Sequence, residues 1–216
     1  MIDPRLDRLP EFDERSRNYP VRALISAPRQ RSYTWSCNTF LDQGREGACV
    51  GFAIAHEFAA RPVSVPVTNI DARDLYHRAR ELDQWPGEDY EGTSVLGGMR
   101  AALETQYITE YRWAFGIDDL IWAIGHKGPA ILGINWHEGM IEPDRRGWIR
   151  PTGAVVGGHA ILARGVNLAR NYIYLHNSWG SDWGSKGMCR IAIDDLGELL
   201  DNDGEAAIPI KRGWGH

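Results

Sequence analysis

The sequence lacks the segments that direct a protein out of the cell or into a membrane. Its N-terminus has no apolar stretch followed by a small-residue cleavage site, and no later stretch approaches about 18 uninterrupted apolar residues. Cysteine is also rare: Cys37, Cys49 and Cys189 are odd in number and far apart, which argues against a disulfide framework. We therefore predict a cytoplasmic protein whose thiols stay reduced.

Lysine is nearly absent, although charge as a whole is not. Only Lys127, Lys186 and Lys211 among the 24 basic residues are lysine, and the net charge at pH 7 is -5. This acidic balance gives no electrostatic reason to expect nucleic acid or a membrane surface as a partner. The arginine bias favours a bacterial or phage origin. With 216 residues, 43% of them hydrophobic, the chain can bury a substantial core, and we expect a soluble monomer.

The chain divides into three segments by composition. Residues 1–35 contain four prolines and few periodic apolar positions, which predicts an extended arm that wraps a larger body. Helical patterns dominate residues 36–113, and short strand-like runs separated by glycines dominate residues 114–216. The sequence therefore predicts an α+β protein with a helical lobe and a β-rich lobe, and a cleft between the two lobes is the expected place for chemistry.

Individual elements can be predicted within these segments. Asn69 or Asp71 is the expected N-cap of the second helix. The expected helices are 49–60, which is apolar on nearly every face, 69–82, 93–107 and a short one at 117–128. The expected strands are 130–136, 157–167, 171–179 and 188–193.

One cysteine stands where a reactive thiol would be stabilised. Cys49 lies in "DQGREGACVGFAIA", between a glycine-containing loop and the first apolar helix. A helix N-terminus stabilises a thiolate through its free N–H groups and the positive end of the helix dipole. Cys49 is therefore the candidate nucleophile.

The other groups that a thiol nucleophile needs are also present. His159, in "GGHAILARGV", follows a glycine pair and begins a strand that would hold its imidazole rigidly as the base. Asn177, at the end of a strand, could orient that ring, and the side-chain amide of Gln43 could donate to an oxyanion.

Three motifs in this order resemble the papain family of cysteine peptidases, which includes the cathepsins. They are "QGREGAC" followed by an apolar helix, "GGHAILARGV", and "NSWGSDWGSKGMCRI", the last being the most specific. The resemblance extends from about residue 36 to about residue 193. It implies a two-lobed fold with a helical left lobe, an antiparallel β-barrel-like right lobe and the active-site cleft between them.

The resemblance also implies a role for each candidate residue. Cys49 and His159 would form a thiolate–imidazolium pair, Asn177 would hold the imidazole, and Trp179 would shield their hydrogen bond from water. Gln43 and the backbone N–H of Cys49 would form the oxyanion hole. The implied reaction is hydrolysis of a peptide or protein substrate through a thioester, with no cofactor and no metal.

The chain departs from the family pattern at several points. Glu46 stands where the family usually has a cysteine, and it is either a charge near the nucleophile or a solvated loop carboxylate. Val50 replaces the usual tryptophan after the nucleophile. Cys49 and His159 are separated by 110 positions, fewer than the roughly 130 to 150 of papain-like enzymes, which predicts trimmed loops.

Glycines are the candidate lining of the substrate cleft. Gly158 precedes the candidate base and leaves room for a substrate backbone. Gly97 and Gly98 correspond in order to a cleft-lining glycine pair of the family, although a loose helix start explains them equally well.

Other functions stay open at this stage. Cys37, Cys189 and His176 lack the spacing of a metal site. A thiol amidohydrolase acting on a specialised amide, such as a cell-wall peptide, would use the same four groups, and a catalytically silent papain-fold binding module is a third possibility.

Overall fold

The computed structural model describes residues 3–25, 29–62, 64–85 and 91–211. Five α-helices occur in this part of the chain: α1 Cys49–Ala59, α2 Asn69–Leu82, α3 Val95–Glu104, α4 Ile117–His126 and α5 Ile193–Asp201. The strands are β1 Tyr33–Thr34, β2 Ile108–Trp113, β3 Ala130–His137, β4 Val155–Asn167, β5 Tyr172–His176, β6 Met188–Ala192 and β7 Glu205–Lys211. Short 3-10 helices are η1 Glu14–Asn18, η2 Val21–Leu24 and η3 Glu138–Met140.

The four predicted helices and four predicted strands are all present, but one predicted cap is wrong. The N-cap of α2 is Thr68, whose hydroxyl accepts from the N–H of Asp71 while the Asp71 carboxylate accepts from the N–H of Thr68. This reciprocal capping box satisfies two helix-end donors at once, which neither Asn69 nor Asp71 could do alone as the cap.

The strands form one antiparallel sheet in the order β2-β7-β3-β4-β5-β6, and β1 pairs with β4 off this path. The predicted α+β class with two unlike lobes is confirmed. The β-rich lobe is not a closed barrel, because the outer strands β2 and β6 are not paired with each other. Strand β2 pairs with β7, so the sheet also takes a strand from the predicted helical segment 36–113.

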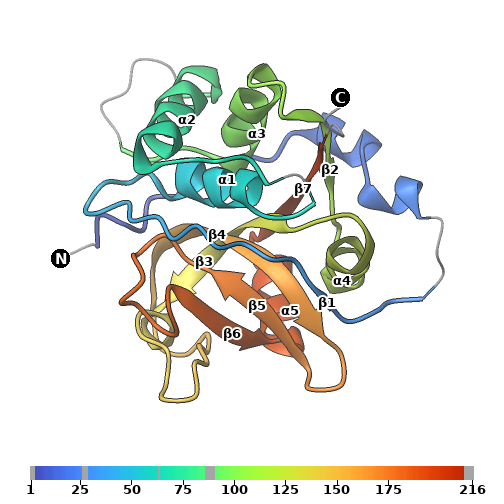
Figure 1. Ribbon diagram of the computed structural model, residues 1–216, viewed down its shortest axis with the longest axis vertical. Helices are drawn as coiled ribbons and strands as arrows, with labels where there is room; N and C mark the ends of the chain where they lie inside the picture. The colour runs from blue at the N-terminus through green and yellow to red at the C-terminus, as the bar shows by residue number, and fades with distance from the viewer. Residues whose placement is uncertain (1–2, 26–28, 63, 86–90, 212–216) are drawn as a thin grey trace.

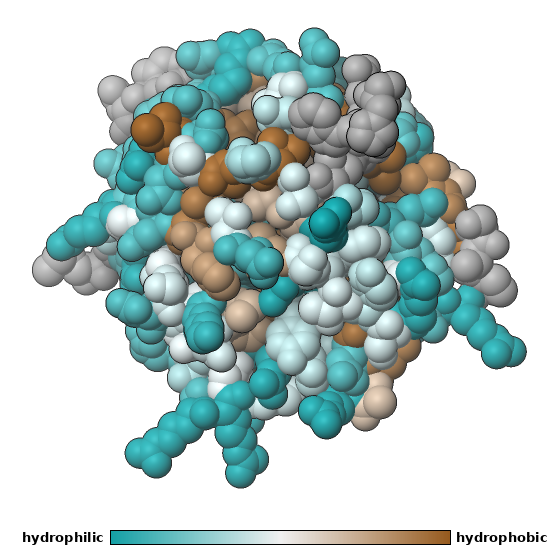
Figure 2. Space-filling view, viewed as in Figure 1, coloured by the Kyte–Doolittle hydropathy of each residue, from teal (hydrophilic) through white to brown (hydrophobic). Residues whose placement is uncertain are grey.

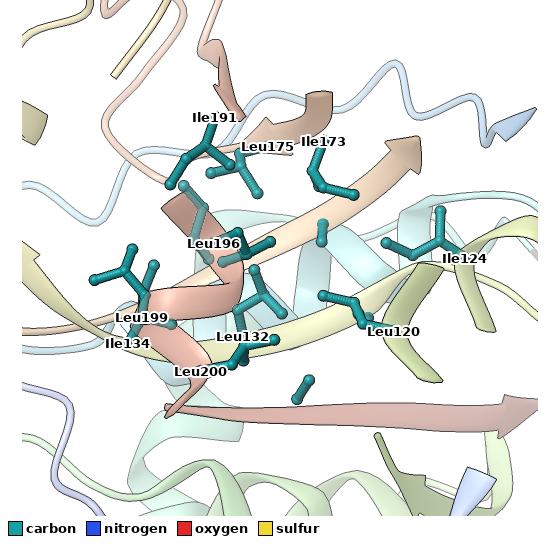
Figure 3. Packing of buried hydrophobic residues seen from close by; sticks show 14 of the residues in the cluster. Leu120, Ile124, Leu132, Ile134, Ile173, Leu175, Ile191, Leu196, Leu199 and Leu200 are labelled. Atoms are coloured by element: carbon teal, nitrogen blue, oxygen red, sulfur yellow. The ribbon is translucent and has the colours of Figure 1, made fainter. Parts of the chain in front are cut away.

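The two faces of the sheet carry different cores because side chains alternate along each strand. Figure 1 shows α1, α2 and α3 together on one side of the sheet. On β3, Ile131 packs with these helices, whereas Leu132 and Ile134 face the opposite cluster with α4 and α5. Figure 3 shows this second cluster, which joins leucines of α5 to Ile173 and Leu175 of β5.

Helix α1 is buried along its whole length. Its neighbours approach closely at two glycines: a Cβ on Gly51 would lie 2.3 Å from the carbonyl oxygen of Ala72 in α2, and a Cβ on Gly98 of α3 would lie 2.5 Å from Val50. These glycines therefore set the spacing of the helix that begins at Cys49.

The outer surface is mainly hydrophilic on the face shown in Figure 2, with scattered apolar residues. Within the described residues, no helix has the length and apolar content needed to cross a membrane.

Replacement of Gly51 by alanine should loosen the packing of α1 on α2. The new methyl group would meet the fixed backbone of Ala72 and the N–H of Tyr76, so overpacking should outweigh the gain in helix propensity of about 1 kcal/mol. We expect the free energy of unfolding, measured by urea denaturation, to fall by about 1 to 3 kcal/mol. Gly128→Ala is the control, because its nearest neighbour is 3.9 Å away. Equal stability of the two variants would refute this packing argument.

Candidate active site

Cys49 lies at the N-terminus of α1, as the sequence predicts. The N-cap residue Ala48 offers no side-chain hydrogen bond, so it leaves the first N–H groups of the helix free for an anion. Cys49 is fully buried, and its sulfur accepts hydrogen bonds from the backbone N–H groups of Ala160 on β4 and Asp7 in the N-terminal arm.

His159 lies on β4, and the structure brings it together with Asn177. Its Nε2 is 2.7 Å from Oδ1 of Asn177, directly after β5. This distance fixes the ring and makes Nε2 the protonated nitrogen, because an amide oxygen only accepts. Nδ1 has no hydrogen-bond partner among the described residues and is left for chemistry.

Two tryptophans enclose the imidazole. Trp179 packs on the ring of His159 with centroids 5.0 Å apart, and Trp136 of β3 meets it edge-on at 4.7 Å. The role predicted for Trp179 is compatible with this position. Nothing in the sequence distinguishes Trp136, which lies inside an ordinary apolar strand.

Gln43 is held by the same loop that carries Asn177. Its backbone N–H donates to the carbonyl of Ser178, and the Ser178 hydroxyl donates to Oε1 of Gln43 at 2.6 Å. These bonds orient the amide so that Nε2 donates to the carbonyls of Glu46 at 2.8 Å and of Arg5 at 3.3 Å. Ser178 is a further site residue that sequence analysis missed, although it belongs to the most specific motif.

The N-terminal arm lies in the cleft between the two lobes. On the sheet side, the N–H of Arg8 donates to the carbonyl of Gly158, and on the helical side the N–H of Leu9 donates to the carbonyl of Thr93. Arg5 covers Trp179, with its guanidinium carbon 3.9 Å from the ring centroid. Among the predicted site residues, the arm therefore contacts Gln43, Gly158 and Trp179.

The predicted lining glycines have different outcomes. Gly158 contacts the arm backbone closely, since a Cβ there would lie 2.1 Å from the carbonyl oxygen of Arg8. Gly97 and Gly98 lie in the first turn of α3, packed against α2 and α1, which agrees with the alternative that they belong to a helix start. From the helical lobe, Gly92 approaches the arm backbone, since a Cβ there would lie 1.9 Å from the Asp7 carbonyl oxygen.

The buried site is uncharged at neutral pH in this arrangement. Burial raises the pKa of the Cys49 thiol to about 11, although the two N–H donors oppose that rise. Burial lowers the pKa of His159 to about 4, although Asn177 opposes that fall. With the arm in place, the thiol and the imidazole are both neutral.

The remaining candidates lie away from these groups. Glu46 forms an ion pair with Arg73 at 3.0 Å on a partly exposed surface. His176 stacks on His56 with centroids 4.3 Å apart, behind the site. None of the three cysteines forms a disulfide bond, and no cluster of metal ligands occurs in the described part of the chain.

Buried histidines should make the fold sensitive to acid. Burial lowers the pKa of His159 to about 4, of His56 to about 3 and of His176 to about 2. Near pH 6.5 these histidines therefore bind protons in the unfolded chain but not in the folded chain. Their stabilising effect is complete above pH 6.5 and is lost as the pH falls, down to about pH 4 for His159, about 3 for His56 and about 2 for His176. Glu205, whose pKa burial raises to about 7, acts in the opposite direction.

We therefore expect urea denaturation to show a net loss of about 2 to 3 kcal/mol per pH unit between pH 6 and 5. The variant His176→Phe should reduce this slope by about 1.4 kcal/mol per unit. An unchanged slope would show that His176 is not held neutral by burial.

Comparisons with known proteins agree with this geometry. Residues 100–201, which include His159 and Asn177, match the family model described as papain family cysteine protease. An uncharacterized peptidase C1-like protein of Acanthamoeba polyphaga mimivirus is 22% identical over 219 residues, covering 78% of this chain and 67% of that protein.

Solved structures share the fold. Xylellain, a cysteine protease from Xylella fastidiosa, has a TM-score of 0.71 at 16% identity, covering 98% of this chain and 97% of that chain. The bromelain protease from Ananas comosus, in complex with the E64 inhibitor, has a TM-score of 0.63 at 16% identity, covering 85% of this chain and all of that chain (100%). The solved structures therefore show a papain-like fold, and the papain family model matches the part of this chain that carries His159 and Asn177.

Proposed function

We propose that this chain hydrolyses peptide bonds with Cys49 as nucleophile and His159 as its general base and acid. The observation that carries the proposal is the buried 2.7 Å hydrogen bond between His159 and Asn177. It occupies Nε2 and leaves Nδ1 as the nitrogen available to exchange a proton with the thiol.

The proposed reaction proceeds in two stages. The Cys49 thiolate attacks the substrate carbonyl carbon, and the oxyanion that forms receives hydrogen bonds from the Gln43 amide and the Cys49 backbone N–H. The tetrahedral species collapses to a thioester while His159 protonates the leaving amine. A water deprotonated by His159 then attacks the thioester, which releases the acid and restores the thiol.

The carbonyl of Arg5 supports the assignment of Gln43. This carbonyl accepts a hydrogen bond from Gln43 Nε2 at 3.3 Å, in the cleft beside Cys49. It thus stands where the proposal places the substrate oxygen. A substrate must displace the arm to reach this position, and entry of water after that displacement would favour the charged thiolate–imidazolium pair over the neutral pair.

Loss of the Gln43 donor should slow the chemical step. For Gln43→Ala we expect kcat/KM on a peptide substrate to fall about 10²-fold, the usual cost of one oxyanion donor. Gln30→Ala, at an exposed glutamine that bonds Asp118 far from the cleft, is the control and should retain full activity. Equal activity of both variants would remove Gln43 from the oxyanion hole.

Covalent labelling tests the nucleophile and the arm together. An epoxide affinity reagent should modify Cys49 and spare the buried Cys37 and Cys189. Arg8→Ala should raise the labelling rate of Cys49 at least about tenfold, because the arm loses a charged hydrogen bond that holds it in the cleft. Arg15→Ala, an exposed arginine of the same segment, should leave the rate unchanged.

Mass spectrometry after proteolysis would locate the label. Modification of Cys37 or Cys189 without Cys49 would contradict the proposal and favour a silent binding module. If Cys49 is labelled but only a cell-wall peptide fragment is hydrolysed, the specialised amidohydrolase is the correct function.

A further inference from the structure

Positive charge is concentrated in one segment of the chain. Residues 141–190 contain seven basic and three acidic residues, whereas the chain as a whole has a net charge of -5 at pH 7. The basic residues, each at least partly exposed, are Arg145, Arg146, Arg150, Arg164, Arg170, Lys186 and Arg190. The β-rich lobe therefore presents positive charge on a protein that is acidic overall.

Most of these basic side chains have no carboxylate partner. Arg78 of α2, by contrast, pairs with two glutamates. Among the described residues, the only ion pair that involves the basic segment joins Arg150 to Asp144 at 3.6 Å. Arg164 and Arg190 therefore carry charges that no carboxylate in the described part of the chain balances.

Arg190 is stacked on two tyrosines of the neighbouring strand. Its guanidinium carbon lies 5.4 Å from the ring centroid of Tyr172 and 5.6 Å from that of Tyr174. Because Ile173 and Leu175 face the core cluster that contains α5, the two tyrosines lie on the opposite, outer face of the sheet. The stack fixes the guanidinium in place and leaves its N–H groups for an acceptor outside the described residues.

A series of hydrogen bonds ends beside this guanidinium. The Asn167 amide donates to the Tyr172 hydroxyl at 3.4 Å, and that hydroxyl donates to the Tyr174 hydroxyl at 3.1 Å. The hydrogen of the Tyr174 hydroxyl has no acceptor in the part of the chain that the structure describes. Arg164 of β4 lies on the other side of Tyr174, because Gly165 pairs with Tyr174. Two cations and a hydroxyl donor therefore lie in one row across β4, β5 and β6.

The loop before β4 extends this row. The N–H of Arg190 donates to the carbonyl of Gly147 at 2.8 Å, and the N–H of Ile149 donates to the carbonyl of Arg190 at 2.9 Å. These bonds hold the loop against β6, as Figure 1 shows, and bring the exposed Arg145 and Arg146 to the margin of the row. We define the arginine face as Arg145, Arg146, Arg164, Tyr174 and Arg190.

The chemistry of the arginine face favours an acidic polypeptide as its partner. Its side chains offer N–H and O–H donors and include no carboxylate. Arg190 covers the rings of Tyr172 and Tyr174, so these rings offer no free face on which a sugar or a nucleobase could stack. A carboxylate needs no such face, and it accepts two parallel hydrogen bonds from the planar guanidinium of an arginine.

We propose that the arginine face binds a segment of a partner protein that is rich in aspartate and glutamate. This inference goes beyond the proposed function, because none of the five residues belongs to the candidate active site. The contact brings an acidic partner to the β-rich lobe whether or not that partner is cleaved.

The first test measures peptide binding by the full chain. The probe is a fluorescent peptide of about twelve residues in which glutamate alternates with serine, and the chain carries Cys49→Ala so that the probe is not cleaved. Fluorescence anisotropy at low salt should show binding at least about tenfold tighter than for the same peptide with glutamine in place of glutamate. Binding should weaken as salt is added, because the arginine face is exposed to solvent.

The second test locates the binding surface in the same Cys49→Ala chain. Arg190→Gln should weaken binding of the glutamate peptide about tenfold, and the double variant Arg145→Gln/Arg146→Gln should weaken it about three- to tenfold. Arg78→Gln is the matched control, because Arg78 is an exposed arginine that already has carboxylate partners. Its affinity for the peptide should stay that of the parent chain.

Each outcome decides for or against the arginine face. Equal binding of the glutamate and glutamine peptides would overturn the proposal, as would an equal loss of affinity in Arg78→Gln and Arg190→Gln. A sulfated oligosaccharide or a single-stranded oligonucleotide that displaces the peptide and binds more tightly would overturn the assignment of an acidic polypeptide. If Arg190→Gln lacks a cooperative unfolding transition, the double variant decides alone. Absence of peptidase activity in the wild-type chain would refute the proposed function and leave these binding results unchanged.

Discussion

The packing of α1 against β4 is the contact on which the site depends. Cys49 begins α1, and its sulfur accepts from the N–H of Ala160, the residue after His159. Because α1 and β4 come from distant parts of the chain, the packing between them keeps the Cys49 thiol and the His159 imidazole in fixed positions relative to each other. The glycines at 51 and 98 allow α2 and α3 to press α1 onto the sheet. A shift of this helix would move the proposed nucleophile, Cys49, away from the proposed base, His159.

Burial gives the site its electrostatic character. Trp136 and Trp179 enclose the His159–Asn177 hydrogen bond in apolar surroundings. Burial in these surroundings also disfavours a charge on the thiol and on the imidazole. With the arm in place, burial therefore favours the neutral forms of the Cys49 thiol and the His159 imidazole.

Local chemistry explains what could be predicted from the sequence. Cys49, His159 and Asn177 could be proposed from their local sequence, because Cys49 begins an apolar helix, His159 follows two glycines in a strand, and Asn177 follows the end of a strand. Gly97 and Gly98 could not be placed, since a glycine pair serves helix packing as well as a cleft wall. Elements α5 and β7 were missed because they are short and contain Gly197 and Pro209, which normally interrupt helices and strands.

The course of the arm could not be predicted, because it depends on contacts between residues far apart in the chain, such as Arg8 and Glu205 at a separation of 197. That arm is covalently joined to the cleft it fills, so its occupancy follows an effective concentration, in the millimolar range for short connections, and not the amount of protein in solution. Dilution cannot empty the cleft. Any molecule that enters the cleft must instead displace a segment that is present once in every chain, so weak binders are excluded.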